Sequence, residues 1–359
     1  MNRKNICEIC TLIMGQSPDS KSYNKDKNGI PFYQGNADFG EEHPTPTVWC
    51  TAPKKIARKG DILISVRAPI GDMNIANEDC CIGRGLAAIR LNKSDIVDIN
   101  YLYHYLSATV EFLQEQGTGS TFKAINKTTL EGIEIPCPSI EKQKNIAKLI
   151  IEIKTSIQYK KAELFALNEL VKSRFIEMFG DIRISSIFPN IALENFAQIG
   201  SSKRVHAADY VESGVPFYRS KEIIELGNGQ EPSVELFISK KQYESIKKTN
   251  GVPCKGDILM SAVGTIGKMW IVDGRKDFYY KDGNIISIHS EETNPIYLKE
   301  ALANLIDDFK SANVAGSAYS ALTIVKLKKM TVPMPPMSIQ NEFADFVKLI
   351  DKSGLCRGD

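Results

Sequence analysis

The feature that most constrains the fold of this chain is a segment that occurs twice. Residues 59–71 read KGDILISVRAPIG, and residues 255–267 read KGDILMSAVGTIG. Both segments begin with Lys-Gly-Asp-Ile-Leu, continue with a serine, and end in Ile-Gly at the same spacing. A segment that returns in this form predicts that a larger part of the chain is duplicated.

Further matches, in the same order, support this duplication. Upstream, GIPFYQGNADF from Gly29 corresponds to GVPFYRSKEII from Gly214. Downstream, GSTFKAINKTTLEGIEIPCP from Gly119 corresponds to GSAYSALTIVKLKKMTVPMP from Gly316. The offset between the copies is 185 residues upstream and 196 at the Lys-Gly-Asp segment, so the second copy has eleven extra residues before that segment. The matches predict two tandem domains rather than a solenoid of short units.

Length and composition are compatible with two domains of ordinary size. The chain has 359 residues, of which 43% are hydrophobic and 25% are charged, as in a typical globular protein. No stretch approaches the roughly 20 apolar residues of a membrane span. The N-terminus MNRKNICEIC also lacks the continuous apolar region of a secretory signal. We therefore expect a cytoplasmic protein.

The cysteines and histidines do not form a pattern of metal ligands. Cys7 and Cys10 have C-x-x-C spacing, but the other six cysteines are scattered and the four histidines lie far apart. A structural zinc site would need a second pair of ligands at short spacing. The expectation is buried free thiols, no metal and no cofactor.

Each copy is predicted to contain two strands followed by a helix. The strands are the apolar runs DILISV and GLAAIRL in the first copy, and DILMSA and NIISIH in the second. Apolar and polar residues alternate poorly in these runs, which indicates that both faces of the strands are covered. The helices are expected at residues 100–114 and 295–310.

A long helix is predicted between the copies, because Ser139 is followed by neither proline nor glycine until Gly180. Apolar residues recur there with a period of 3.5 residues, which only Lys160 and Arg174 interrupt. This period is typical of a coiled coil whose seam needs a partner helix. At about 1.5 Å per residue, the helix would be a rod roughly 55 Å long. Its predicted seam residues are Ile146, Ile150, Ile153, Ile157, Leu164, Leu167, Val171 and Met178.

Two similar domains on one rod suit the recognition of two separated sites on a linear polymer, and DNA is the obvious candidate. The net charge of +2 is small, so any basic surface must be local. Loop residues with cationic, amide or hydroxyl side chains are the predicted contacts, because such groups match base edges and phosphates. These residues are Gln34, Asn36, Arg67, Arg84 and Lys123 in the first copy, and Lys203, Arg204, Arg219, Lys221, Lys281, Asn284 and Tyr319 in the second.

The double set of motifs resembles the specificity subunit of type I restriction-modification systems. The motifs are the Gly-Asp-Ile-Leu-x-Ser strand, the GIPFYQG loop, the Gly-Ser-x-(Phe/Tyr) turn, and a Pro-x-Pro followed by a long helix in which Gln143 matches Gln340. The resemblance covers nearly the whole chain. It implies an α+β fold with two tandem pseudo-symmetric α/β target-recognition domains joined by long coiled-coil-type helices.

The same resemblance implies a non-catalytic subunit without its own active site. Such a subunit reads a split sequence in double-stranded DNA and binds methyltransferase subunits and restriction (motor-nuclease) subunits. The loops of the two copies differ, with YQGNADF in the first and YRSKEII in the second. The two half-sites are therefore expected to differ, so that the DNA target is asymmetric.

Two other functions stay open at the level of sequence. The segment Asn294-Pro-Ile-Tyr297 resembles the Asn-Pro-Pro-Tyr loop with which amino-methyltransferases hold a flipped base. The matching segment in the first copy, Asp98-Ile-Asn-Tyr101, favours a helix start instead, and no glycine-rich loop for S-adenosylmethionine follows a strand. The other alternative is a coiled-coil adaptor, which would not bind duplex DNA even with methyltransferase subunits present.

The last helix of the chain departs from the resemblance, which implies a long helix after the second domain, packed antiparallel along the central one. The sequence predicts a shorter helix there. We predict a first target-recognition domain at 1–138, a central long helix at 139–182, a second target-recognition domain at 183–336 and a short distal helix at 337–359. The apolar residues of the distal helix include Phe343, Phe346, Val347 and Ile350, and Ser353-Gly354 is expected to stop it.

A short distal helix would leave part of the central seam without an intramolecular partner. The residues concerned would be several of Ile157, Leu164, Leu167, Val171 and Met178. Exposed apolar side chains favour association. We therefore expect the isolated chain to self-associate through the central helix, or to be insoluble without methyltransferase subunits, and to be a truncated form of a longer subunit. A neighbouring loop that covers the seam is the alternative.

Overall fold

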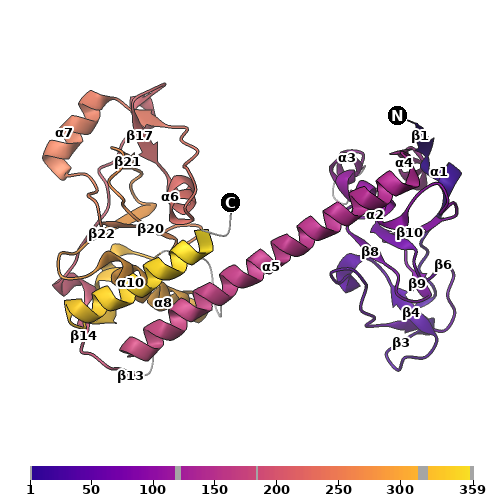
Figure 1. Cartoon of the computed structure of the whole chain (residues 1–359), viewed down its shortest axis with the longest axis horizontal. Helices are drawn as coiled ribbons and strands as arrows, with labels where there is room; N and C mark the ends of the chain where they lie inside the picture. Colours follow the sequence, from indigo (N-terminus) through magenta and orange to yellow (C-terminus); the bar gives the residue numbers. More distant parts are fainter. Residues whose placement is uncertain (1, 118–122, 183–184, 314–321, 356–359) are drawn as a thin grey trace. The chain divides into compact units, whose positions relative to one another are not determined.

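The structure is a computed structural model that describes residues 2–117, 123–182, 185–313 and 322–355. The chain forms two compact units, residues 1–160 and 161–359. The long helix α5 (Ile140–Phe179) contributes residues to both units (Figure 1).

The first unit contains a four-stranded sheet, a five-stranded sheet, a separate strand pair and several short helices. Its strands are β1 (Arg3–Asn5), β2 (Cys10–Met14), β3 (Tyr23–Asn24), β4 (Ile30–Tyr33), β5 (Trp49–Cys50), β6 (Ile56–Ala57), β7 (Ile62–Ser65), β8 (Met73–Ile75), β9 (Cys80–Ile82), β10 (Leu86–Leu91) and β11 (Glu134–Pro136). Its helices are α1 (Ile6–Ile9), α2 (Ile99–Ala108), α3 (Val110–Glu115) and α4 (Lys127–Glu131). One sheet has the strand order β2-β10-β7-β8, the other has the order β3-β5-β4-β9-β6, and β1 pairs with β11.

The second unit has the same kinds of element. Its strands are β12 (Gly180–Asp181), β13 (Ser185–Ser186), β14 (Asn190–Ala192), β15 (Gln198–Gly200), β16 (Tyr210–Val211), β17 (Val215–Tyr218), β18 (Phe237–Ile238), β19 (Ile258–Ser261), β20 (Met269–Ile271), β21 (Tyr279–Tyr280), β22 (Ile285–His289) and β23 (Thr331–Pro333). Its helices are α6 (Ser220–Gly227), α7 (Lys240–Asn250), α8 (Pro295–Asn313), α9 (Ile324–Lys328) and α10 (Met337–Leu355).

The sheets of the second unit repeat those of the first. The order β15-β22-β19-β20 matches β2-β10-β7-β8, and β16-β18-β17-β21 matches β3-β5-β4-β9. In both units the second sheet contains one parallel pair, β4 with β9 and β17 with β21. The predicted fold of two tandem, pseudo-symmetric domains is therefore confirmed. The eleven extra residues of the second copy fall in the region of α6 and α7. These helices take the places of a short 3-10 turn at Asn36–Asp38 and of the edge strand β6 in the first copy.

The strands of the Lys-Gly-Asp segments lie between two layers, as their poor alternation predicted. In β7, Ile62 and Ile64 pack into the core that includes Leu102 of α2, whereas Leu63 packs on the opposite side with Tyr33 of β4. All four residues of β7 and of β19 are buried. Burial on both faces explains why these strands read as continuous apolar runs.

Two predicted helix boundaries are wrong. The single helix expected at residues 100–114 is broken at Thr109, whose hydroxyl and backbone N–H both bond to the carbonyl of Leu106. A threonine hydroxyl that bonds the preceding turn competes with regular helix geometry. The distal helix α10 does not stop at Ser353-Gly354 but continues to Leu355.

The matching glutamines of the two copies have the same structural role. The side chain of Gln143 is fully buried, where its Oε1 accepts a hydrogen bond from Asp98 N at 3.0 Å and its Nε2 donates to Pro138 O at 2.9 Å. Gln340 is equally buried, and its Oε1 accepts from Asn294 N at 2.8 Å. Each glutamine thus ties the first turn of α5 or α10 to the start of a helix earlier in the same copy, α2 or α8.

The two ends of α5 belong to two different cores. At its start, Ala147 is buried and Ile146 packs beside it in the core of the first unit. At its end, Val171, Phe175 and Phe179 are buried in the core of the second unit. The heptad period did not predict Phe175 or Phe179, although these two rings are almost completely buried.

Helix α10 lies along the last turns of α5 (Figure 1), and aromatic rings of the two helices are in contact. The ring of Phe343 lies 5.5 Å from that of Phe175 and 5.4 Å from that of Phe179. Val171 and Met178 therefore do not lack an intramolecular partner, which corrects the expectation for these two residues. Val171 is buried, and Met178 packs against the same core. Phe346 and Ile350 of α10 also pack against it.

The middle of α5 is uncovered. The exposed fractions are 58% for Ile153, 49% for Ile157 and 55% for Leu164. Ile150 and Leu167, at the margins of this stretch, are half-buried. The seam therefore has a central part whose apolar side chains face solvent.

Candidate nucleic-acid interface

In the first unit, Gln34 and Arg84 lie at one end of the sheet that contains β4 and β9. Each residue follows shortly after one of these two parallel strands. The hydroxyl of Ser17 joins them, because its Oγ donates to Gln34 Oε1 at 2.8 Å and accepts from Arg84 N at 3.4 Å. The two predicted contacts are thus adjacent, although fifty positions separate them in the sequence.

The loops of Arg67 and Lys123 join the same cluster. The backbone N–H of Ala68 donates to Lys123 O at 3.1 Å, and the backbone N–H of Val66 donates to Gly85 O at 2.9 Å. Arg67, Arg84 and Lys123 are exposed, and no acidic side chain among the described residues forms an ion pair with them. This end of the sheet therefore presents three cations that are available to a ligand.

Asn36 has a different environment. Its Nδ2 donates to Asp72 Oδ2 at 2.6 Å. The amide of Asn36 is therefore engaged by a carboxylate of its own unit.

In the second unit, the backbone of Lys281 and of Asn284 takes the places of Gly83 and Gly85, the two neighbours of Arg84 in the first unit. Lys281 N donates to Tyr218 O at 2.9 Å, as Gly83 N does to Tyr33 O in the first unit. The carbonyl of Asn284 accepts from Ala262 N at 2.8 Å. Both side chains are half-buried.

Lys203 lies beside this cluster. Its backbone N–H donates to Tyr279 Oη at 2.7 Å, which fixes the loop after β15 against β21. The side chain of Lys203 is exposed.

Three predicted cations of the second unit are held by acidic side chains. Arg219 Nη2 contacts Glu222 at 2.8 Å and Glu235 at 2.9 Å, and Lys221 Nζ contacts Glu235 at 3.0 Å. The hydrogen bond to Glu222, which is buried, raises the pKa of Arg219. Because both cations bond to Glu235, the pKa of that carboxyl is lowered.

Arg204 is similarly engaged, since its Nε lies 2.7 Å from Asp282 Oδ2. The last predicted contact, Tyr319, lies outside the described residues. The structure thus separates the predicted cations into two groups. Arg204, Arg219 at the N-cap of α6 and Lys221 within α6 have acidic partners, whereas no acidic partner of Lys203 occurs in the described part of the chain.

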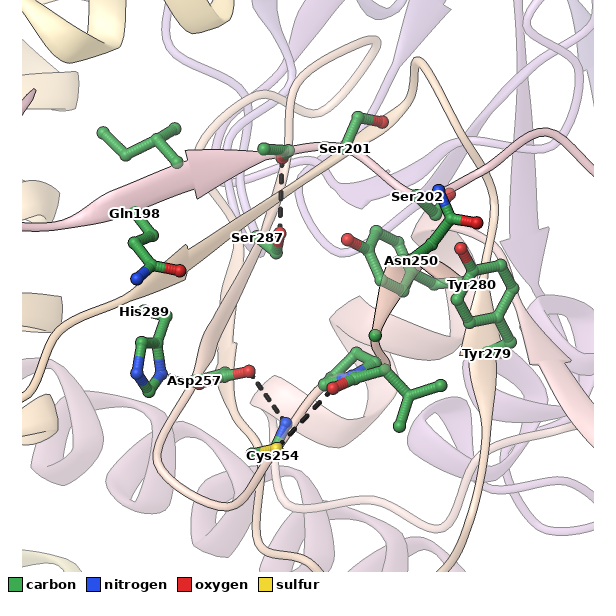
Figure 2. A pocket seen from close by; sticks show the side chains of 15 residues that line it. Gln198, Ser201, Ser202, Asn250, Cys254, Asp257, Tyr279, Tyr280, Ser287 and His289 are labelled. Atoms are coloured by element: carbon green, nitrogen blue, oxygen red, sulfur yellow. Dashed lines mark hydrogen bonds and ion pairs between the residues drawn. The ribbon is translucent and has the colours of Figure 1, made fainter. Parts of the chain in front are cut away.

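A cavity of about 490 Å³ in the second unit is lined in part by Ser201 and Ser202, which directly precede Lys203 in the chain (Figure 2). His289 and Asp257 line it, with His289 Nδ1 2.7 Å from Asp257 Oδ1. The corresponding pair in the first unit is Arg90 with Asp61, at 2.8 Å. The aspartate of each Lys-Gly-Asp segment therefore binds one cationic or imidazole side chain from the neighbouring strand.

The same aspartates also accept backbone hydrogen bonds. Asp257 Oδ2 accepts from Cys254 N, and Asp61 Oδ2 accepts from Arg58 N, each at 2.8 Å. These contacts hold the turn before β7 and β19. The aspartate in the repeated motif is explained by this structural role, and sequence reasoning had not assigned it one.

Cysteine burial follows the expectation only in part. Cys10, Cys50, Cys80 and Cys81 are buried free thiols, whereas Cys7 and Cys254 are exposed. Burial raises the pKa of Cys10 and of Cys80 to about 12. In the described ranges, no group of three or more Cys, His, Asp or Glu side chains is arranged to hold a metal ion.

The segment Asn294–Tyr297 is a helix start. Asn294 Oδ1 accepts a hydrogen bond from Ile296 N at 2.9 Å at the beginning of α8. The ring of Tyr297 is fully buried, and its hydroxyl donates to Pro333 O, as Tyr101 does to Pro136 O at 2.9 Å. Both tyrosine side chains are part of the core, and the segment has the same structural role as residues 98–101 of the first unit.

None of the helices in the described part of the chain is both long enough and apolar enough to cross a membrane.

Comparison with known families gives the class of the protein. The profile of the type I restriction modification DNA specificity domain matches residues 1–169 and again residues 188–355. The chain belongs to this family.

Individual relatives agree with this assignment. The chain is 45% identical over 177 residues to the MjaX type I restriction enzyme specificity subunit of Methanocaldococcus jannaschii, which covers 49% of this chain and 41% of that protein. It is 27% identical over 271 residues to a type I restriction enzyme specificity subunit of Haemophilus influenzae, which covers 73% of this chain and 66% of that protein. The chain thus spans less than two thirds of the length of both relatives.

A solved structure shares the fold. The S subunit of a type I restriction-modification system from M. genitalium superposes with a TM-score of 0.60 and 15% sequence identity, over 98% of this chain and 90% of that chain.

Proposed function

We propose that the chain is a non-catalytic DNA-recognition subunit of a type I restriction-modification complex. Each of its two units would read one half of a bipartite, asymmetric target in double-stranded DNA. The predicted division into two target-recognition domains, a central helix and a distal helix is part of this proposal.

The observation that carries the proposal is the repeated arrangement of loops. In each unit, loops with cationic and amide side chains meet at the end of the sheet where its parallel strands finish, around Arg84 in one unit and Lys281 in the other. Groups of this kind can contact phosphates and base edges. The loops differ in sequence and in their ion pairs, which supports two different half-sites.

The proposal includes protein partners. The uncovered middle of α5 offers apolar side chains, including Ile157 and Leu164, to a further helix. Methyltransferase subunits are the proposed occupants in the complex, with restriction subunits joining the assembly. Self-association through the same surface is proposed for the isolated chain.

Methylome sequencing tests the proposed function. A host that carries this chain with its methyltransferase subunits should show one methylated motif with two different halves and a fixed spacer. The test variant is Arg67→Ala/Arg84→Ala in the same host. We expect methylation at the motif to fall in this variant, because two phosphate or base contacts are removed. A symmetric motif, or the absence of any motif with the unchanged chain, would contradict the proposal.

A further inference from the structure

A pair of lysines precedes the Lys-Gly-Asp motif in both copies, as Lys54-Lys55 and as Lys247-Lys248. Neither pair belongs to the set of contacts predicted from the sequence. All four side chains are exposed. Within the described ranges of the chain, no acidic side chain forms an ion pair with any of them.

In the first unit, the pair lies at the same end of the sheet as Arg84. Lys55 O accepts a hydrogen bond from Ile82 N at 3.0 Å, just before β6 begins its antiparallel pairing with β9. Ile82 is the last residue of β9, and Arg84 follows two positions later. The lysine pair therefore extends the cationic loop cluster along the edge of the sheet.

In the second unit, the pair lies in the last turns of α7. Tyr243 and Ile246 are buried and anchor the inner face of this helix, and Tyr243 Oη donates to Asp277 Oδ1 at 3.0 Å. The ammonium group of Lys247 lies 5.8 Å from the centre of the Tyr243 ring, and the Lys247 side chain is exposed. The helix thus has a fixed orientation that leaves Lys247 and Lys248 in solvent.

The end of α7 is close to the predicted DNA loop of the second unit. Asn250, its last residue, lines the cavity together with Ser201 and Ser202, and Figure 2 shows Asn250 beside Ser202. Lys203 follows directly in the chain. Different local structures, an edge strand in one unit and a helix in the other, therefore bring a lysine pair to the corresponding cationic cluster.

We propose that both lysine pairs bind the phosphate backbone of duplex DNA. An ammonium group is a compact point charge that binds phosphate without requiring the fixed geometry of a base edge. The pairs would therefore contribute affinity that does not depend on sequence, next to loops that read bases. This inference rests on the proposed function.

The test is the salt dependence of DNA binding, measured on the full chain assembled with its methyltransferase subunits. The test variants are Lys54→Ala/Lys55→Ala and Lys247→Ala/Lys248→Ala. Each has a matched control that removes two cations from the other end of the same element, Arg58→Ala/Lys59→Ala for β6 and Lys240→Ala/Lys241→Ala for α7. Binding to a fluorescent duplex that carries the methylated motif is measured between about 50 and 200 mM salt.

Each test variant should reduce the slope of log K against log[salt] by about 1 to 2, because each lost phosphate contact removes about 0.9 from the slope. The controls should keep the slope of the unchanged chain, and all variants should methylate the same motif. The inference is overturned if test and control variants have equal slopes, or if a test variant changes the motif. Failure of the unchanged complex to bind any duplex would instead overturn the proposed function. Equal melting temperatures exclude an effect on folding.

Discussion

At the residue scale, the duplication separates structural residues from candidate DNA contacts. Gln143 and Gln340, the two aspartates of the Lys-Gly-Asp segments, and the buried tyrosines at the helix starts keep the same bonds in both units. Arg67, by contrast, corresponds to Val263 in the otherwise equivalent loop, where the valine is 47% exposed. Positions that stay the same hold the fold, whereas exposed positions that change are candidates for reading different half-sites.

Replacing a paired glutamine should destabilise its own unit. Gln143→Ala leaves the N–H of Asp98 and the carbonyls of Ile96 and Pro138 without their buried partner, so the free energy of unfolding of the first unit should fall by about 1–3 kcal/mol. Gln340→Ala should have a similar effect on the second unit. Both changes in the free energy of unfolding are measured by chemical denaturation, with proteolysis used to detect the unfolding of each unit separately.

The control is Gln230→Ala, because the side chain of Gln230 is exposed. This variant should change the free energy of unfolding by less than about 0.5 kcal/mol. An equal loss in Gln230→Ala and Gln143→Ala would show that the buried hydrogen bonds do not matter.

At the scale of the element, α5 combines three environments in one continuous helix. Its first turns pack into the first unit and its last turns into the second, and between them apolar residues are exposed. Beyond the residues that pack into the first core, α5 is stabilised by its own backbone hydrogen bonds and by side-chain pairs on its surface, such as Lys148 with Glu152. An exposed apolar stripe on such a helix favours contact with another helix.

The uncovered stretch of α5 should cause the isolated chain to self-associate. The double variant Ile157→Lys/Leu164→Lys introduces two charges into this stretch, so association measured by sedimentation velocity at micromolar concentration should be lost. Val325→Lys, which introduces a charge at an exposed valine of α9, should leave association unchanged. A monomeric unchanged chain would contradict this prediction.

At the scale of the whole molecule, the proposed independence of the two domains can be tested by exchange. Residues 15–136 are replaced with the matching region of a related specificity subunit. This region contains the loops that carry Gln34, Arg67, Arg84 and Lys123, whereas β1 and β2 precede it and are kept. Methylome sequencing should then show a change in one half of the motif, with the other half and the spacer intact. Changes in both halves would show that the domains do not read their half-sites independently.

The sequence by itself determined the duplication, the apolar strands, the long central helix and the family. Each of these features depends on order and periodicity along the chain, since a strand buried on both faces and a helix without proline or glycine have local signatures. The sheet orders of the two units agree with the alignment of the copies. The break at Thr109 was missed because helix periodicity is the same on both of its sides.

Only the tertiary structure decided which side chains are available to a partner. Arg219 looks like a free loop cation in the sequence, but Glu235, sixteen positions away, holds its guanidinium. Val171 looks like an open seam position, but it is buried in the core that Phe343 of α10 completes. Ion pairs and burial join residues that are distant in the chain, and their formation depends on distances in space that no local pattern contains.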